Sequence, residues 1–349
     1  MSTEPTKPHV SAKKRYIVLL TVIAFVIVGW SGAWVYGKSV LSDQIDLHMA
    51  RMAGRGHEVG CADLGVAGYP FRYEVRCRVF TSKGRFGAEG NLGSLNGVAL
   101  VYNPWHVILE ADAPAAIAVP GSGVSGELSW DTARASIKYS LDALGDLDMV
   151  LTKPELAYRD MHSVATASSE KAEFHLRRTP SLPDGVDGYV SVDALMLESV
   201  PDLKAPLDLR AHVQLKNGSP LLSGANLALL TQMSGGKLPI QLVFSEIKTG
   251  NSRFGASGDL ILDGAGLLSG QVKLSLSNPE QALAIVKPLF PPQNNGFAVA
   301  EGLFKSLKPT ITDSDGNPAI ELPLAIDQGM MRIGFVTLGW IPPLFQAGI

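Results

Sequence analysis

An uninterrupted apolar segment near the N-terminus constrains the fold more than any other feature of the chain. Residues 16–36, YIVLLTVIAFVIVGWSGAWVY, contain no charged side chain. About 20 helical residues cross the roughly 30 Å hydrocarbon core of a bilayer, so this segment is long enough to span a membrane once. Lys13, Lys14 and Arg15 precede it, and basic residues on this flank favour a cytoplasmic N-terminus. We therefore expect residues 1–15 to be a cytoplasmic tail and the rest of the chain to be exported.

Cleavage by a signal peptidase is the alternative for this segment. Its densest apolar part, residues 17–28, has the length of a signal-peptide core, and Ser31–Ala33 offers small residues for cleavage. Trp30 and Trp34 flank that site, and the apolar character continues to Tyr36, which favours an uncleaved transmembrane helix. Both alternatives export the remainder.

The segment that follows has the pattern of a helix. Between Lys38 and Ala53 there is neither glycine nor proline, and apolar residues recur at helical spacing. We predict that residues 37–54 form a helical stalk with one apolar stripe, which continues the membrane helix and ends at Gly54 or Gly56.

Residues 55–349 have the composition and patterning of a β-rich domain. The chain holds 36 glycines and 22 prolines and is only 18% charged. Short apolar or alternating runs recur about every 8 to 12 residues between turn residues, which predicts a mainly β fold. We expect an extended, curved antiparallel sheet that is groove-like or sandwich-like. Strands are predicted at residues 86–92, 98–102, 105–110, 115–119, 127–131, 133–141, 146–156, 163–176, 189–197, 206–216, 238–248, 255–262, 270–277, 319–326 and 330–337.

A few segments of this domain favour helix. Residues 226–233 predict a short helix. Asn278 and Pro279 resemble an N-cap and a first helical residue, and they begin a predicted helix that ends at Phe290. With residues 296–307, this helix would form a small helical hairpin near the C-terminus.

One internal repeat raises the alternative of two similar halves. RFGAEGNL at residues 85–92 matches RFGASGDL at residues 253–260 at six of eight positions. A duplicated β-rich half would explain the match, and glycine-rich strand ends that resemble each other by chance would also explain it.

The two cysteines, Cys61 and Cys77, predict a disulfide. An exported chain reaches an oxidising compartment, where such a pair is normally bonded. Gly68, Tyr69 and Pro70 form a turn midway between them, so we expect a hairpin that places the cysteines opposite each other. The alternative, a redox or metal pair, lacks a Cys-x-x-Cys spacing and a third ligand nearby.

The turn continues as Gly68-Tyr69-Pro70-Phe71-Arg72, which is the other candidate site. On a strand, Tyr69 and Phe71 would point to one side and Arg72 to the other. A packed hairpin tip explains this motif, and contact with lipid or a partner protein is the functional alternative.

Charge and the remaining motifs give no catalytic, cofactor or metal assignment. The net charge is −3, and the basic tail makes the exported part more acidic, which disfavours nucleic acid and anionic lipid surfaces as partners. Gly121–Gly126 matches G-x-G-x-x-G, but a strand pattern follows it where a dinucleotide site needs a helix. Ser168–Lys171 matches S-x-x-K without its companion motifs. Asp313–Asn317 lacks the full calcium-loop pattern and predicts a turn.

Cys61, the Gly68–Arg72 motif and Cys77 resemble a bacterial domain-of-unknown-function family, number 2125, found mainly in alphaproteobacteria. The Asn103–Trp105 turn and residues 258–272 are also similar to it. The resemblance implies an N-terminal segment in the inner membrane and a bulk in the periplasm, and it assigns no catalytic residue. A more distant architectural similarity, carried by the phrase at residues 258–274, is to AsmA-like envelope proteins. Those proteins are associated with lipid transport and outer-membrane homeostasis.

These patterns lead to two functional hypotheses. A curved sheet with an apolar inner face can shelter acyl chains from water, so we expect a non-catalytic protein that binds a lipid or another apolar envelope component. The alternative is a scaffold module whose sheet presents a surface to other envelope proteins. A hydrolase is a weaker third hypothesis. An open groove would favour the first hypothesis, and a fully packed core would favour the second.

Overall fold

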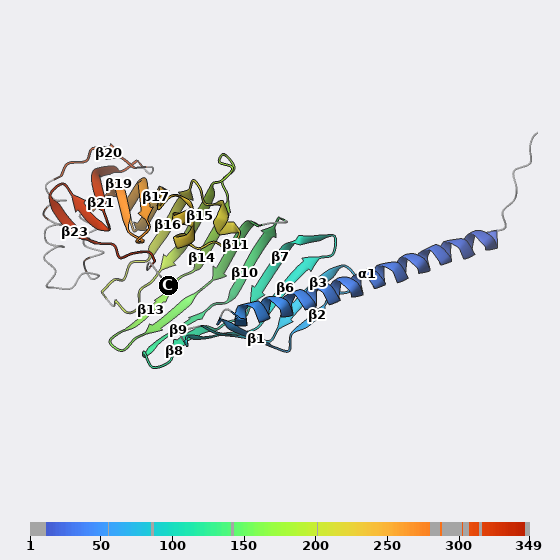
Figure 1. The fold of residues 1–349 in the computed structure, drawn as a ribbon. Helices are drawn as coiled ribbons and strands as arrows, with labels where there is room; N and C mark the ends of the chain where they lie inside the picture. The colour runs from blue at the N-terminus through green and yellow to red at the C-terminus, as the bar shows by residue number, and fades with distance from the viewer. Residues whose placement is uncertain are drawn as a thin grey trace, which may run out of the picture.

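A computed structural model describes residues 12–345, except 55, 85–86, 141–142, 201, 280–286, 288–301, 303–306 and 314–315. The described chain consists of one long helix, two short helices and two antiparallel sheets (Figure 1). The predicted helical hairpin between Asn278 and residue 307 lies almost wholly outside the described residues.

Helix α1, Ala12–Gly54, is continuous and ends at one of the two glycines that the sequence indicated. Residues 13–30 are exposed on all sides, and this part of the helix projects away from the sheets (Figure 1). From Ser31 onward, one stripe of the helix is covered by the β domain. The covered residues are Ser31, Trp34, Gly37, Lys38, Leu41, Ser42, Ile45 and Met49.

The strands form a 7-stranded sheet and a 16-stranded sheet, and all of their pairings are antiparallel. The smaller sheet holds, in order, β1 (Glu58–Ala62), β4 (Val79–Lys83), β5 (Glu89–Leu92), β8 (Ala115–Val119), β9 (Val124–Ser129), β12 (Glu155–Arg159) and β13 (Val164–Ser168). The larger sheet holds β2 (Gly65–Ala67), β3 (Arg72–Cys77), β6 (Leu95–Leu100), β7 (Asn103–Ala111), β10 (Thr132–Tyr139), β11 (Leu144–Thr152), β14 (Lys171–Arg178), β15 (Val186–Leu195), β16 (Leu207–Leu215), β17 (Lys237–Thr249), β18 (Ser252–Asp263), β19 (Leu268–Ser277), β21 (Pro318–Asp327), β22 (Met330–Ile333) and β23 (Val336–Trp340), with β20 (Ile311–Thr312) beside β21.

The first half of the domain, from β1 to β15, alternates between the two sheets. Hairpins β2–β3, β6–β7, β10–β11 and β14–β15 join the larger sheet, and hairpins β4–β5, β8–β9 and β12–β13 join the smaller one. The chain therefore builds both sheets at once. The second half adds strands to the larger sheet alone, so the two segments of the internal repeat occupy different places, β5 in one sheet and β18 in the other.

Among the described residues, the clusters of buried apolar side chains lie in the second half, after β15. Helix α3, Leu227–Met233, begins at the predicted position, where the Asn226 side chain accepts a hydrogen bond from the Leu229 amide at 2.8 Å. With the shorter helix α2, Ser219–Leu222, it covers the start of β17 and the end of β18, where Leu230, Leu238 and Leu262 are buried together. A second buried cluster joins Val272, Leu324 and Ile326 on β19 and β21.

The larger sheet has one apolar face and one polar face. Residues paired across antiparallel strands lie on the same face, so register identifies each row. One row across β6 to β16 is Gly97, Leu109, Ala135, Met149, Phe174, Val190 and Ala211. The adjacent row on the opposite face is Val98, Ile108, Ser136, Asp148, His175, Tyr189 and His212.

The smaller sheet has the same division between its faces. Its apolar row runs from Cys61 through Phe80, Leu92, Ala115, Leu128 and Leu156 to Ala167. We call the apolar faces of the two sheets the inner faces.

The predicted disulfide between Cys61 and Cys77 is present, but its expected place in a hairpin is wrong. Cys61 is on β1 in the smaller sheet and Cys77 on β3 in the larger sheet, and their Cα atoms are 5.5 Å apart. The chain leaves β1 at Asp63, which has φ of 56°, and the hairpin at Gly68–Phe71 joins β2 to β3 with Gly65 opposite Arg76. The disulfide therefore links the two sheets.

Candidate apolar ligand site

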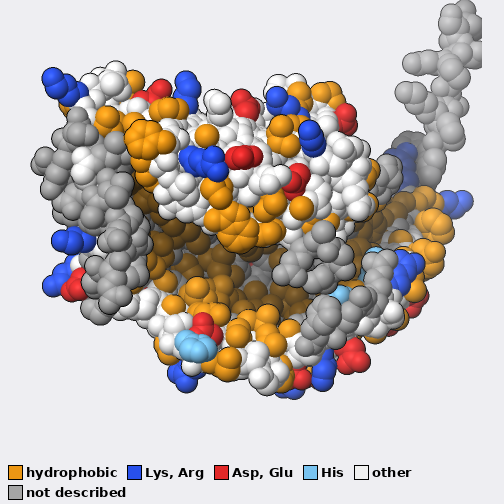
Figure 2. All heavy atoms as spheres, turned by 60° about the vertical axis from the view of Figure 1, so that its left-hand side comes forward, with side chains coloured by type: hydrophobic (Ala, Val, Ile, Leu, Met, Phe, Trp, Pro, Cys, Tyr) orange, Lys and Arg blue, Asp and Glu red, His pale blue; other side chains and the backbone are white. Residues whose placement is uncertain are grey.

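The inner faces enclose a hollow that the side chains of the described residues leave open. Figure 2 shows this hollow from the C-terminal side, with hydrophobic side chains on its walls. Met149 and Val190 on the inner face of the larger sheet are 38% and 42% exposed, and Ile117 on the smaller sheet is 55% exposed. Among the described residues of 78–185, no Val, Leu, Ile, Met, Phe, Tyr or Trp side chain is buried. A dry sandwich would bury most of these side chains.

One apolar part of this site lies beneath α1. A cavity of about 660 Å³ is lined by α1 from Tyr36 to Met52 and by both sheets. Val59, Cys61 and Phe80 contribute from the smaller sheet, and strands β3, β6 and β7 contribute Tyr73, Val75, Cys77, Leu95, Gly97, Ala99, Pro104, Val107 and Leu109. Ligand pockets usually hold about 300–1,000 Å³, so this cavity has room for part of a lipid.

A second apolar cavity lies on the inner face of strands β17 to β21. Its volume is about 230 Å³, and Ile247, Phe254, Leu274 and Ile320 are among the residues that line it. Apolar space is therefore present toward both ends of the inner surface.

The Gly68–Arg72 motif packs against α1. The Trp30 indole N–H donates to the Pro70 carbonyl at 2.9 Å, and the Ser31 and Tyr69 hydroxyls are 2.8 Å apart. The Trp34 indole N–H donates to the Arg72 carbonyl at 3.1 Å. The motif thus holds the sheet against the helix at residues 30–34.

The Trp34 ring adds aromatic contacts to this interface, edge-on to Tyr69 and stacked on Tyr73. The Trp34 ring centroid is 5.5 Å from that of Tyr69 and 5.7 Å from that of Tyr73, and Trp34 is buried. Gly37 permits the close approach, because a Cβ atom there would lie 2.1 Å from the Tyr73 hydroxyl. The sequence singled out the motif and the tryptophans separately, but it did not predict that they contact each other.

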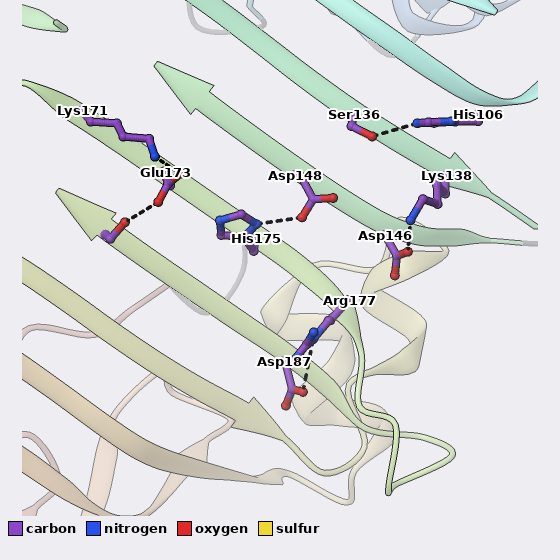
Figure 3. Close-up of polar contacts among 11 residues, drawn as sticks. His106, Ser136, Lys138, Asp146, Asp148, Lys171, Glu173, His175, Arg177 and Asp187 are labelled. Atoms are coloured by element: carbon purple, nitrogen blue, oxygen red, sulfur yellow. Dashed lines mark hydrogen bonds and ion pairs between the residues drawn. The ribbon is translucent and has the colours of Figure 1, made fainter. Parts of the chain in front are cut away.

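The outer face of the larger sheet is covered by polar pairs (Figure 3). His175 Nδ1 and Asp148 Oδ1 are 2.7 Å apart, and Lys138 Nζ is 3.0 Å from Asp146. These pairs make this face more polar than the inner face.

Asp187 is the most buried acid of this polar face. Burial alone would raise its pKa, but hydrogen bonds from Gln214 at 3.0 Å and Thr179 at 2.9 Å outweigh it, helped by His212. The pKa of Asp187 is therefore lower than usual and the group is charged at neutral pH. It lines a cavity of about 250 Å³ together with Asp148, His175, Arg177, Tyr189 and His212.

The motifs considered for chemistry lie in turns. Gly121 and Gly123, with φ of 81° and 68°, belong to the turn between β8 and β9. Ser168 and Lys171 flank the turn between β13 and β14, and Lys171 pairs with Glu173.

Within the described parts of the chain, no group of three or more His, Cys, Asp or Glu side chains is placed to hold a metal ion.

These features define a β protein of two sheets with an apolar interior and one N-terminal helix long and apolar enough to cross a membrane. The chain belongs to a bacterial family described as "Uncharacterized protein conserved in bacteria (DUF2125)", whose model matches residues 34–342. No curated protein and no solved structure matches the chain.

Proposed function

We propose that this protein is anchored in the bacterial inner membrane by α1 and binds a lipid or another apolar envelope component between its sheets in the periplasm. The binding is non-catalytic. The observation that carries the proposal is the row of half-exposed apolar side chains on both inner faces, since water contact with such surface costs about 25 cal/mol per Å². A bound acyl chain would remove this surface from water.

The position of the largest apolar cavity supports a membrane lipid as the ligand. The cavity is walled by Tyr36, which ends the apolar span of α1, and by Gly37 and Val40 just after it. An acyl chain could move from the bilayer to the inner faces along this helix. The architectural resemblance to AsmA-like envelope proteins belongs to the same proposal.

A photo-reactive amino acid placed on one strand tests the proposal. Phe174 and His175 are neighbours on β14, but Phe174 is in the inner row and His175 in the outer row. In full-length protein expressed in cells, we expect a probe at position 174 to form lipid adducts detectable by mass spectrometry. A probe at position 175 is the matched control and should form none. Absence of lipid adducts at 174, 109 and 151 would contradict the proposal.

The scaffold hypothesis is the second candidate, because the smaller sheet also has a hollow on its outer side. This hollow of about 830 Å³ is lined mostly by small and charged residues, including Gly60, Ala116, Glu127 and Arg159. A probe at Ala116 that captured a protein, together with no lipid at position 174, would favour the scaffold.

A further inference from the structure

The length of α1 fixes where the bilayer must end relative to the β domain. No charged residue lies between Arg15 and Lys38, and this stretch of about 22 residues measures about 33 Å as a helix. That length matches a hydrocarbon core of about 30 Å. The far boundary of the core therefore falls close to Lys38, whose ammonium group lies 5.9 Å from the Trp34 ring.

The turn between β2 and β3 contacts α1 on the membrane side of this boundary. It binds the helix at Trp30 and Ser31, through Pro70 and Tyr69. Ser31 precedes Lys38 by seven residues, or about 10 Å along the helix axis. The Phe71 ring centroid is 6.4 Å from that of Trp30, so the tip reaches the same depth.

A second uncharged turn lies beside the first. The Val101 amide donates to the Phe71 carbonyl at 3.0 Å, which places the turn between β6 and β7 next to the tip. Four aromatic side chains lie in or beside the two turns and are more than half exposed: Tyr69 at 53%, Phe71 at 63%, Tyr102 at 74% and Trp105, near the start of β7, at 51%. Aromatic side chains of this kind are favoured at the bilayer interface.

The alternative placement, with both turns in water, leaves the helix too short. If the bilayer ended before Trp30, only residues 16–29 would remain inside it, which is about 21 Å of helix. The span and the docked turns are therefore compatible only when the turns enter the bilayer.

We propose that the β2–β3 turn and the β6–β7 turn insert into the periplasmic interface of the membrane that α1 crosses. The aromatic patch of Tyr69, Phe71, Tyr102 and Trp105 is then a lipid-contacting surface. It makes the β domain a second membrane contact that is independent of whether the inner faces bind a ligand.

Depth-dependent quenching tests this proposal on the full chain in phosphatidylcholine–phosphatidylglycerol nanodiscs. A fluorescent amino acid would replace Tyr102 or, as control, Phe335, which is 98% exposed in the turn before β23. Strand β23 lies at the end of the domain opposite α1 (Figure 1). Lipids with a spin label near the headgroup end of the acyl chain should quench position 102 at least threefold more than position 335. Equal quenching at the two positions would overturn the proposal.

A charged variant distinguishes insertion from mere proximity to the anchor. Phe71→Asp should reduce the quenching at position 102 several-fold, whereas Thr81→Asp, on the outer face of β4, should leave it unchanged. Formation of the Cys61–Cys77 disulfide in each variant shows that the domain is folded. Two results would also overturn the proposal: unchanged quenching in folded Phe71→Asp protein, and a mature chain that begins after Ala33 and so lacks Trp30 and Ser31.

Discussion

At the scale of single residues, two positions carry structural roles that their neighbours do not share. A Cβ atom on Gly37 would overlap the Tyr73 side chain of β3, whereas a Cβ atom on Gly29 would meet nothing within 4 Å. Asp187 is a buried acid on a face where most other charged groups are exposed, and it accepts hydrogen bonds from Gln214 on β16 and from Thr179 in the loop after β14.

We expect Gly37→Leu to destabilise the contact between α1 and the larger sheet. The added side chain overlaps the Tyr73 ring, and overpacking of this kind typically costs about 1–3 kcal/mol. The thermal midpoint of the full-length protein in nanodiscs should fall by several degrees. Gly29→Leu is the matched control, and an equal fall in both variants would show that the helix surface, and not the contact, is responsible.

We expect Asp187→Asn to reduce stability in a pH-dependent way. A lowered pKa in the folded state stabilises the protein above the unfolded pKa of about 4, and this contribution is lost as the pH falls through the folded pKa. Losing a hydrogen-bonded buried charge should cost about 1–3 kcal/mol at pH 7. Thermal midpoints measured from pH 7 to pH 3 should converge for the two proteins, and a constant difference would contradict this assignment.

At the scale of elements, local sequence patterns predicted most individual segments. The helix from the span into the stalk, the short helix after Asn226 and strands such as β8 and β19 are found within a few residues of their predicted positions. Two long predictions were wrong. Residues 146–156 contain a turn at Lys153–Pro154, where Lys153 adopts φ of 47° and β11 ends. Residues 163–176 contain a turn at Ser169–Glu170, between β13 and β14.

Local patterns could not predict which strands pair. Strands β4 and β5 follow each other in the chain and pair, but the sequence around β5 does not show that its other neighbour is β8. This is why the sequence predicted the Cys61–Cys77 bond yet placed it across a hairpin. The pairing depends on contacts between strands that are separated in the sequence, and a local pattern does not record these contacts.

We expect removal of the disulfide to loosen the junction of the two sheets. A bond that closes a loop of this length contributes about 3 kcal/mol in the chain-entropy model. The double variant Cys61→Ala, Cys77→Ala should have a thermal midpoint several degrees lower, and a reductant should lower the wild-type midpoint similarly. If the reductant lowered the midpoint of the double variant as well, its effect on the wild-type protein could not be assigned to the disulfide.

At the scale of the whole molecule, packing is uneven. The second half has buried clusters around Leu262 and Leu324, and the inner faces of the first half remain half-exposed. The sequence predicted the apolar inner face through its alternation. It could not predict whether that face is filled, because alternation reports which side chains share a face and not what lies opposite them.

We expect equal truncations to have unequal effects in the two halves. Leu262→Ala removes a side chain that is 0% exposed and should cost about 2–5 kcal/mol. Leu151→Ala, on the inner face of β11, removes a half-buried side chain next to open space and should cost about 1 kcal/mol. Thermal midpoints of the two full-length variants measure the difference, and similar losses would indicate that the first half is packed as tightly as the second.

Because the hairpins alternate between the sheets, the length of the hollow between them depends on the number of hairpin pairs. Among the described strands, none pairs back to close either sheet into a barrel. A block such as β8–β11 adds one hairpin to each sheet, so removing it would bring β5 beside β12 and β7 beside β14 with the same orientations. Two strand spacings amount to about 10 Å. Relatives that gain or lose such a block would keep both ends of the fold and change the length of the molecule that fits between the sheets.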